Sequence, residues 1–157
     1  MIKLSFKSEI KVEKEDLVKH SFSMEGVNFE LFPWIRLTYP KGSYLFKKNI
    51  KPPGQFLFRS LTLFLGIVPI DLHSFYFYSL DFDGHFVEMS NSLVFKQWNH
   101  TRIISSIDGG SLLEDYLEFS PRLVLFRKLV KFLINRVFLH RHNKIKKKFG
   151  VVNGVKN

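Results

Sequence analysis

Apolar and polar residues alternate along the first segment of the chain. Ile2, Leu4 and Phe6 are separated by single polar residues, and Ile10 and Val12 resume the pattern after an interruption. A period of two is typical of a strand that buries one face. Residues 2–12 are therefore predicted to form a half-buried β-strand.

The next segments predict two short helices. Residues 13–22 read as the first of them, and residues 27–37 form either a second helix interrupted at Pro33 or an irregular segment. Two short helices after the first strand would form a V that closes one end of a sheet. Turn residues follow at 39–43 and 51–54, where proline, glycine and serine are concentrated.

After Gly54 the pattern predicts an antiparallel sheet with short connections. Residues 66–70 are expected to bend, and Asp81 to Gly84 has the composition of a hairpin turn. The segments 85–89 and 93–104 are interpreted as parts of one bulged strand. The predicted strand segments are 55–64, 72–80, 85–89, 93–104 and 112–119.

A long C-terminal helix is predicted after the last strand. Ser120 is a suitable N-cap, Pro121 suits the first helical position, and Gly150 stands where a C-cap glycine belongs. Apolar residues at three- and four-residue spacing share one face of it. That face carries Phe126, Val130, Leu133 and Val137, and the next position on the same row is Arg141.

A hairpin that leads into one long helix predicts the architecture. It indicates an α+β domain in which a curved sheet wraps around the helix, with room between them for an apolar ligand. Residues 1–150 are expected to form one domain, and residues 151–157 a frayed tail.

Composition supports a wide apolar interior and excludes some chemistry. Hydrophobic residues make up 45% of the 157 positions, and 18 of them are Phe, which buries a large area and favours strands. The chain has no cysteine, so disulfides, cysteine-ligated metals and a thiol nucleophile are excluded. No secretion signal is recognised, and the longest apolar run, 61–70, is too short to span a bilayer. A cytoplasmic location is expected.

The formal net charge is +10, and much of it lies near the C-terminus. Lys144, Lys146, Lys147 and Lys148 either form a solvated helix end or make weak contact with an anionic membrane. No nucleic-acid-binding motif is recognised, so sequence-specific binding to nucleic acid is not expected.

One cluster of polar residues is predicted inside the sheet. Trp98, His100 and Arg102 share a face of one strand, and Asp115 lies on the partner strand across a tight turn. If they point inward, His100 and Asp115 form a pair in an apolar cavity, and Arg141 lies close enough to join it. The carboxylate is expected to raise the pKa of the imidazole. The cluster is either a structural network, a ligand contact or an acid–base site.

Other chemistry has little support. Asp71, His73 and His85 match no metal-ligand spacing, and no metal or other cofactor is expected. His140 and His142 are predicted to point to different faces of the helix. Neither a phosphate-binding glycine loop nor a nucleophile elbow is present.

Several motifs of the chain resemble those of a known family. The motifs on which the resemblance rests are Trp98-x-His100-x-Arg102, Asp108-Gly109-Gly110, the segment 113–119 and the helix end at 140–142. The segments 66–73 and 86–88 also resemble this family. They resemble the SRPBCC superfamily of START-like, birch-pollen-allergen-like helix-grip proteins, and more narrowly its bacterial ligand-binding or polyketide-cyclase-like members.

The resemblance implies a helix-grip fold, in which a curved antiparallel sheet of six to seven strands wraps around the C-terminal helix. It also implies a cavity for lipids, polyketides or similar molecules. The expected function is intracellular binding of a hydrophobic small molecule, more plausibly as a carrier than as an enzyme. The alternatives are a cyclase or dehydratase that uses His100 and Asp115, or a peripheral membrane protein that uses the basic helix end. The expected ligand contacts are Trp98, His100, Arg102, Asp115, Phe126, Val130, Leu133, Val137 and Arg141. The Phe-rich interior leaves a further alternative, in which side chains fill the cavity.

Overall fold

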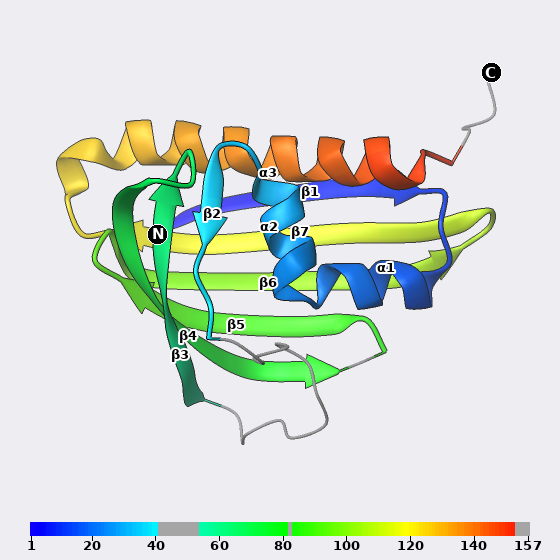
Figure 1. Ribbon diagram of the computed structural model, residues 1–157, viewed down its shortest axis with the longest axis horizontal. Coiled ribbons are helices and arrows are strands. Elements are labelled where there is room, and N and C mark those ends of the chain that lie inside the picture. The colour runs from blue at the N-terminus through cyan, green and yellow to red at the C-terminus, as the bar shows by residue number, and fades with distance from the viewer. Residues whose placement is uncertain (41–53, 82, 153–157) are drawn as a thin grey trace.

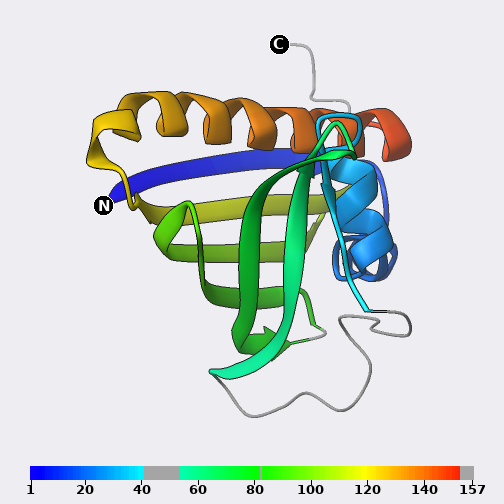
Figure 2. The ribbon, with the colours of Figure 1, turned by 60° about the vertical axis from the view of Figure 1, so that its left-hand side comes forward.

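A computed structural model of the protein describes residues 1–40, 54–81 and 83–152. Seven strands form one antiparallel sheet in the order β1-β7-β6-β5-β4-β3-β2. The sheet curls strongly, and a long helix lies along its concave side (Figures 1 and 2). This is the α+β helix-grip architecture that the sequence predicts.

The strands and helices occur in the following chain order. They are β1 (Ile2–Ile10), α1 (Lys14–Ser21), α2 (Met24–Leu31), β2 (Ile35–Leu37), β3 (Gln55–Phe64), β4 (Val68–Asp81), β5 (His85–Ser92), β6 (Phe95–Ile107), β7 (Gly110–Pro121), a 3-10 turn η1 (Val124–Phe126) and α3 (Arg127–Phe149). Within the described residues no helix is long and apolar enough to cross a membrane.

The predicted second helix is misplaced by a few residues. α2 begins after Ser23, whose hydroxyl accepts the N–H of Gly26 at 3.0 Å, and it ends before Phe32. The residue before a proline avoids helical angles, and Phe32, which precedes Pro33, is extended. The expected second helix is therefore present, but residues 27–37 are divided between the end of α2, a turn and the short edge strand β2, which pairs with β3.

β5 and β6 are two strands, which corrects the prediction of one bulged strand. The chain turns sharply after Ser92, whose hydroxyl accepts the backbone N–H groups of Val94 (3.2 Å) and Phe95 (2.9 Å). Asp71 accepts a further bond from Val94 at 3.1 Å. These side-chain acceptors stabilise the turn, and the two strands then pair antiparallel from His85↔Ile103 to Ser90↔Trp98.

The C-terminal helix starts later than predicted. β7 runs on to Pro121, which pairs with Phe95 and is buried, and α3 begins at Arg127. Ser120 is therefore a strand residue and not an N-cap, and Phe126 belongs to η1 and not to the helix face. Gly150 ends α3 as predicted, with its N–H bonded to Lys146 O.

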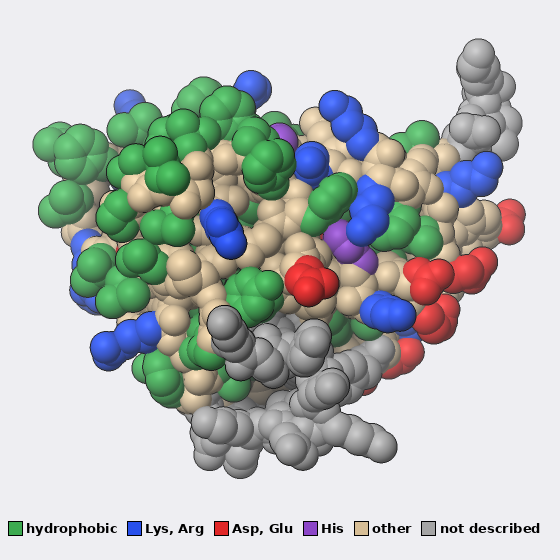
Figure 3. All heavy atoms as spheres, in the orientation of Figure 1, with side chains coloured by type: hydrophobic (Ala, Val, Ile, Leu, Met, Phe, Trp, Pro, Cys, Tyr) green, Lys and Arg blue, Asp and Glu red, His purple; other side chains and the backbone are tan. Residues whose placement is uncertain are grey.

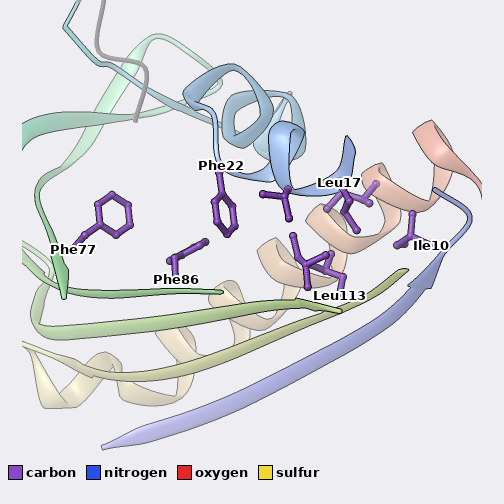
Figure 4. Close-up of a cluster of buried hydrophobic side chains, with 9 residues drawn as sticks. Ile10, Leu17, Phe22, Phe77, Phe86 and Leu113 are labelled. Carbon is purple, nitrogen blue, oxygen red and sulfur yellow. The ribbon is translucent and has the colours of Figure 1, made fainter. Parts of the chain in front are cut away.

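Apolar side chains fill the two ends of the curled sheet. One cluster joins α1 and the C-terminal end of α3 to the sheet through Ile10, Leu17, Leu113 and Ile145, all fully buried (Figure 4). A second cluster, around Phe119 and Phe138, packs the middle of α3 on β1, β6 and β7. Ordered contact continues past residue 150, since Val151 bridges to Ile10. The turn segments at 41–43 and 51–53 lie outside the described residues.

Candidate functional site

A large cavity lies between the concave face of the sheet and α3. Its volume is about 1020 Å³, and its walls come from the end of α1, from α2, β2 to β6 and from α3. Most of the wall is apolar, with Phe75, Phe77, Phe86 and Trp98 on the sheet and Val137 and Phe138 on the helix. The Phe-rich interior therefore encloses space and does not fill it.

The predicted ligand contacts separate into three groups. Trp98, His100, Arg141, Val130, Leu133 and Val137 line the cavity. Arg102 and Asp115 are fully buried behind this wall, and they reach the cavity only through their hydrogen-bond partners. Phe126 lies outside the lining and is 47% exposed, because the helix begins after it.

Arg102 is the centre of the buried network. Its guanidinium donates to Asp115 at 2.8 Å through both Nε and Nη2, and to the two oxygens of Glu30 at 3.0 and 3.1 Å. Burial on its own would lower the pKa of Arg102, but the charges of Asp115 and Glu30 outweigh it and raise the pKa. Arg102 therefore stays charged, and four of its five N–H groups donate to carboxylate oxygens.

Asp115 and Glu30 are ionised for the same reason. Burial would raise the pKa of each, but Arg102 holds the pKa of Asp115 well below its usual range and also lowers that of Glu30. Arg141 adds to the effect on Glu30, to which its Nε donates at 2.9 Å. Two carboxylates and two guanidiniums thus balance in charge between α2, β6, β7 and α3.

The predicted pair of His100 and Asp115 is present, with Nε2 of the ring 2.8 Å from Oδ1. The predicted direction of the pKa shift is wrong. Burial of the ring lowers the pKa of His100 by more than the nearby Asp115 raises it, and the charges of Arg141 and Arg102 lower it further. His100 is consequently neutral, donates through Nε2 to Asp115 and presents Nδ1 on the other side of the ring.

Two further cavity residues escaped sequence reasoning. His73 lines the cavity and donates through Nε2 to Glu88 at 2.7 Å, and the other oxygen of Glu88 lies 3.9 Å from Nδ1 of His100. Burial would raise the pKa of Glu88, but the hydrogen bond and charge of His73 lower it. The alternation along β5 carries the signal for Glu88, because it follows the inward-facing Phe86 by two residues.

His142 and Glu30 were also missed. His142 bonds to Asp115 (3.0 Å) and to the hydroxyl of Ser8 (2.8 Å), whereas His140 contacts the carbonyl of Phe32. The two histidines serve different faces, as predicted, but one of them belongs to the network. Glu30 stands between Phe29 and Leu31, and nothing in that local pattern indicates a buried partner for Arg102.

Ser21 adds an unused polar group. Its hydroxyl is buried in a residue that lines the cavity, and it has no hydrogen-bond partner within the described part of the chain. A buried hydroxyl without a partner costs free energy. Across residues 1–40, 54–81 and 83–152 no cluster of His, Asp or Glu is arranged to hold a metal ion.

Comparison with known proteins places the chain in a family. The model of a domain of unknown function, DUF8410, matches residues 8–149. The chain belongs to the DUF8410 family. No protein with a curated functional description matches this DUF8410 sequence significantly.

Solved structures share the fold of this DUF8410 protein at low sequence identity. Protein CV1439 from Chromobacterium violaceum superimposes with a TM-score of 0.69 at 7% identity, over 96% of this chain and 99% of its own. A START superfamily protein from Mycobacterium smegmatis gives 0.68 at 14%, over 94% and 96%. Ara h 8.0201 gives 0.58 at 14%, over 93% and 98%. The fold is thus that of the START-like, birch-pollen-allergen-like helix-grip proteins.

Proposed function

We propose that this protein binds a hydrophobic small molecule, such as a lipid or polyketide, in the cavity between the sheet and α3. The observation that carries the proposal is a space of about 1020 Å³ with mainly aromatic and aliphatic walls. Ligand pockets for molecules of this kind measure roughly 300–1,000 Å³. The presence of a START superfamily protein among its structural relatives supports the same kind of ligand.

The polar part of the wall limits what the ligand carries. Glu88 is ionised, and His100 presents the unprotonated Nδ1 near it, so both groups accept hydrogen bonds. A ligand with a hydroxyl or amine would donate to one or the other of them. We propose an amphipathic ligand with such a donor at its buried end.

A binding test can use a neutral fluorescent probe, because a neutral probe has no attraction to the basic surface. N-phenyl-1-naphthylamine should bind saturably to the wild type. Val137→Trp, which adds bulk inside the cavity, should reduce that binding at least about tenfold. Met89→Trp is the matched control, since Met89 is 46% exposed on the outer face of β5. Equal binding by the wild type and the Val137→Trp variant would contradict the proposal.

The ligand itself can be sought by native mass spectrometry of protein purified from its own host. An apolar compound released on organic extraction, and absent from the Val137→Trp variant, identifies the ligand class. We propose that binding takes place in the cytoplasm, since a chain without cysteine needs no oxidising compartment to fold.

An enzymatic role is the second candidate, and the His100–Asp115 pair favours it. Asp115 also accepts bonds from Arg102 and His142 and lies behind the wall, so it would orient the ring and not exchange protons with a substrate. His100 would then be the base, through Nδ1. Conversion of the extracted compound by the wild type, but not by a His100→Ala variant that still binds the probe, would establish this activity.

A further inference from the structure

The cavity opens to solvent beneath an apolar surface. Several apolar residues that line it are also exposed, among them Trp34, Phe64, Ile70, Phe132 and Leu133. They come from the segment before β2, from the β3–β4 hairpin and from the first half of α3. These three segments therefore form the mouth.

Protruding apolar side chains flank the mouth on two sides. Leu65, Ile67 and Val68 form the tip of the β3–β4 hairpin, where Ile67 is 77% exposed. On the other side, Leu123, Val124, Leu125, Phe126 and Leu129 precede or begin α3, and Leu125 is 89% exposed. We call the residues of the mouth and of these two protrusions the mouth face. In Figure 3 hydrophobic side chains gather at the upper left, over the start of α3.

Basic residues lie in the same segments as this face, and no described carboxylate pairs with them. Arg122, Arg127, Lys128, Lys131 and Arg136 are all exposed, and within the described residues none pairs with a carboxylate. Arg36 adds a sixth cation beside Gly66 in the hairpin turn. No Asp or Glu occurs after Glu118, nor between Gln55 and Ile70. Red side chains in Figure 3 gather toward the opposite end of the molecule.

We propose that the mouth face docks on an anionic lipid bilayer. Exposed apolar patches of this extent mark interaction sites, and the uncompensated positive charge selects an anionic partner. A second copy of the chain would bring like charges together. The exposed apolar side chains stand at the β3–β4 hairpin and in the segment before α3, and a bilayer accommodates such side chains at its headgroup boundary. A ligand would then pass between bilayer and cavity without crossing water.

The basic end of α3 is a different surface with a different use. Lys144 and Lys148 lie over the ring of Phe29, with Nζ 4.5 and 4.7 Å from its centroid, and Lys148 also donates to His20 at 3.1 Å. These two lysines hold α2 against α3. Lys146 and Lys147 are free of such contacts, and they provide a control of equal charge.

Vesicle sedimentation tests the proposal on the full chain. Vesicles of phosphatidylcholine with roughly 30 mol % phosphatidylglycerol should bind the wild type at low salt, and pure phosphatidylcholine vesicles should bind it at least about tenfold more weakly. Two double variants test the mouth face, and each should lower binding to anionic vesicles by about tenfold or more: Ile67→Asp with Leu125→Asp, and Lys128→Glu with Lys131→Glu.

Two further variants are the controls, and their binding should stay within about twofold of that of the wild type. They are Met89→Asp, and Lys146→Glu with Lys147→Glu. Thermal melting checks that each variant is folded.

Fluorescence gives a second readout at the mouth. In a Trp98→Phe variant Trp34 is the remaining tryptophan, and its emission should shift to the blue and be quenched by brominated lipid. Three results would overturn the proposal. The first is equal binding of the wild type to neutral and anionic vesicles. The second is loss of binding in the Lys146/Lys147 variant while the mouth variants bind normally. The third is a wild type that forms a stable dimer in solution while the Ile67/Leu125 variant is monomeric.

Discussion

Glu30 and Arg102 form a two-point ion pair, at 3.0 and 3.1 Å, between a short helix and the middle of the sheet. Both side chains are completely buried. Replacement of Arg102 by Met would leave Glu30 and Asp115 as buried carboxylates without their main partner, and removal of one partner of a buried pair costs about 3–5 kcal/mol. We expect Arg102→Met to lower the free energy of unfolding in urea by about that amount.

The matched control for this prediction is Arg59→Met on β3. Arg59 is exposed and forms no ion pair among the described residues. Its replacement should change the free energy of unfolding by less than about 0.5 kcal/mol. An equally small effect of both substitutions would show that the network contributes nothing to stability.

The pH dependence of stability should reveal the buried histidines. Burial lowers the pKa of His20 to about 4; the charge of Glu30 opposes this shift, and the charge of Lys148 adds to it. Burial also lowers the pKa of His100. Between pH 6.5 and 4 the unfolded chain takes up protons at these rings and the folded chain does not, so stability falls as the pH falls. Urea midpoints should decline through this window.

His20→Gln isolates one contribution to that decline. The variant has no ring to protonate, so its urea midpoint should fall less steeply between pH 6.5 and 4.5 than that of the wild type. Glu30 and Asp115, whose pKa values are lowered, contribute stability above their unfolded pKa values and lose it only at still lower pH. Identical slopes for the wild type and His20→Gln would mean that His20 titrates alike in both states.

Ligand preference should follow the charge of Glu88. Decan-1-ol can donate to Glu88 or to His100, whereas decanoate would bring a second negative charge to an ionised carboxylate. Both compounds can be tested for displacement of N-phenyl-1-naphthylamine at high salt, which screens the basic surface. The concentration needed for half displacement should be about tenfold lower for decan-1-ol than for decanoate. In the Glu88→Gln variant the two concentrations should be closer together. An unchanged ratio would indicate that the headgroup lies elsewhere, for example near Arg136 at the mouth.

The corner between α1 and α2 depends on Gly26. A Cβ at this position would lie 1.8 Å from the backbone oxygen of His20, and a backbone group cannot move aside as a side-chain end can. We expect Gly26→Ala to lower the free energy of unfolding by about 1–3 kcal/mol, the usual cost of overpacking. Glu25→Ala, on the exposed side of the same turn, is the control. A stable Gly26→Ala variant would mean that the corner is free to shift.

Periodicity predicted the strands of this fold well, because each buries one face. It could not place the start of α3, since Ser120 and Pro121 suit both a helix start and a strand end, and the pairing of Pro121 with Phe95 decides between them. The turn at Ser92 was missed for a similar reason: its acceptors, one of them Asp71, are contributed partly by a distant strand.

The site was predicted in outline by alternation along β6 and β7. That pattern brought Trp98, His100, Arg102 and Asp115 to one face, and the hairpin register made His100 and Asp115 neighbours. The direction of the His100 pKa shift depends on the depth of burial, which a local pattern does not contain. Glu30 reaches Arg102 across 72 positions of the chain, so it could be found only from the fold.

The two halves of α3 are held very differently. The second half is held by Phe138, Arg141, His142 and Ile145, which are buried, and the first half exposes Leu129, Phe132 and Leu133. Among the described residues, the buried ion pairs of α3 all belong to its second half. If the first half moves aside while the second half stays docked, a bound molecule leaves by this local movement and not by unfolding of the whole protein. Its rate of release would then be independent of the global stability.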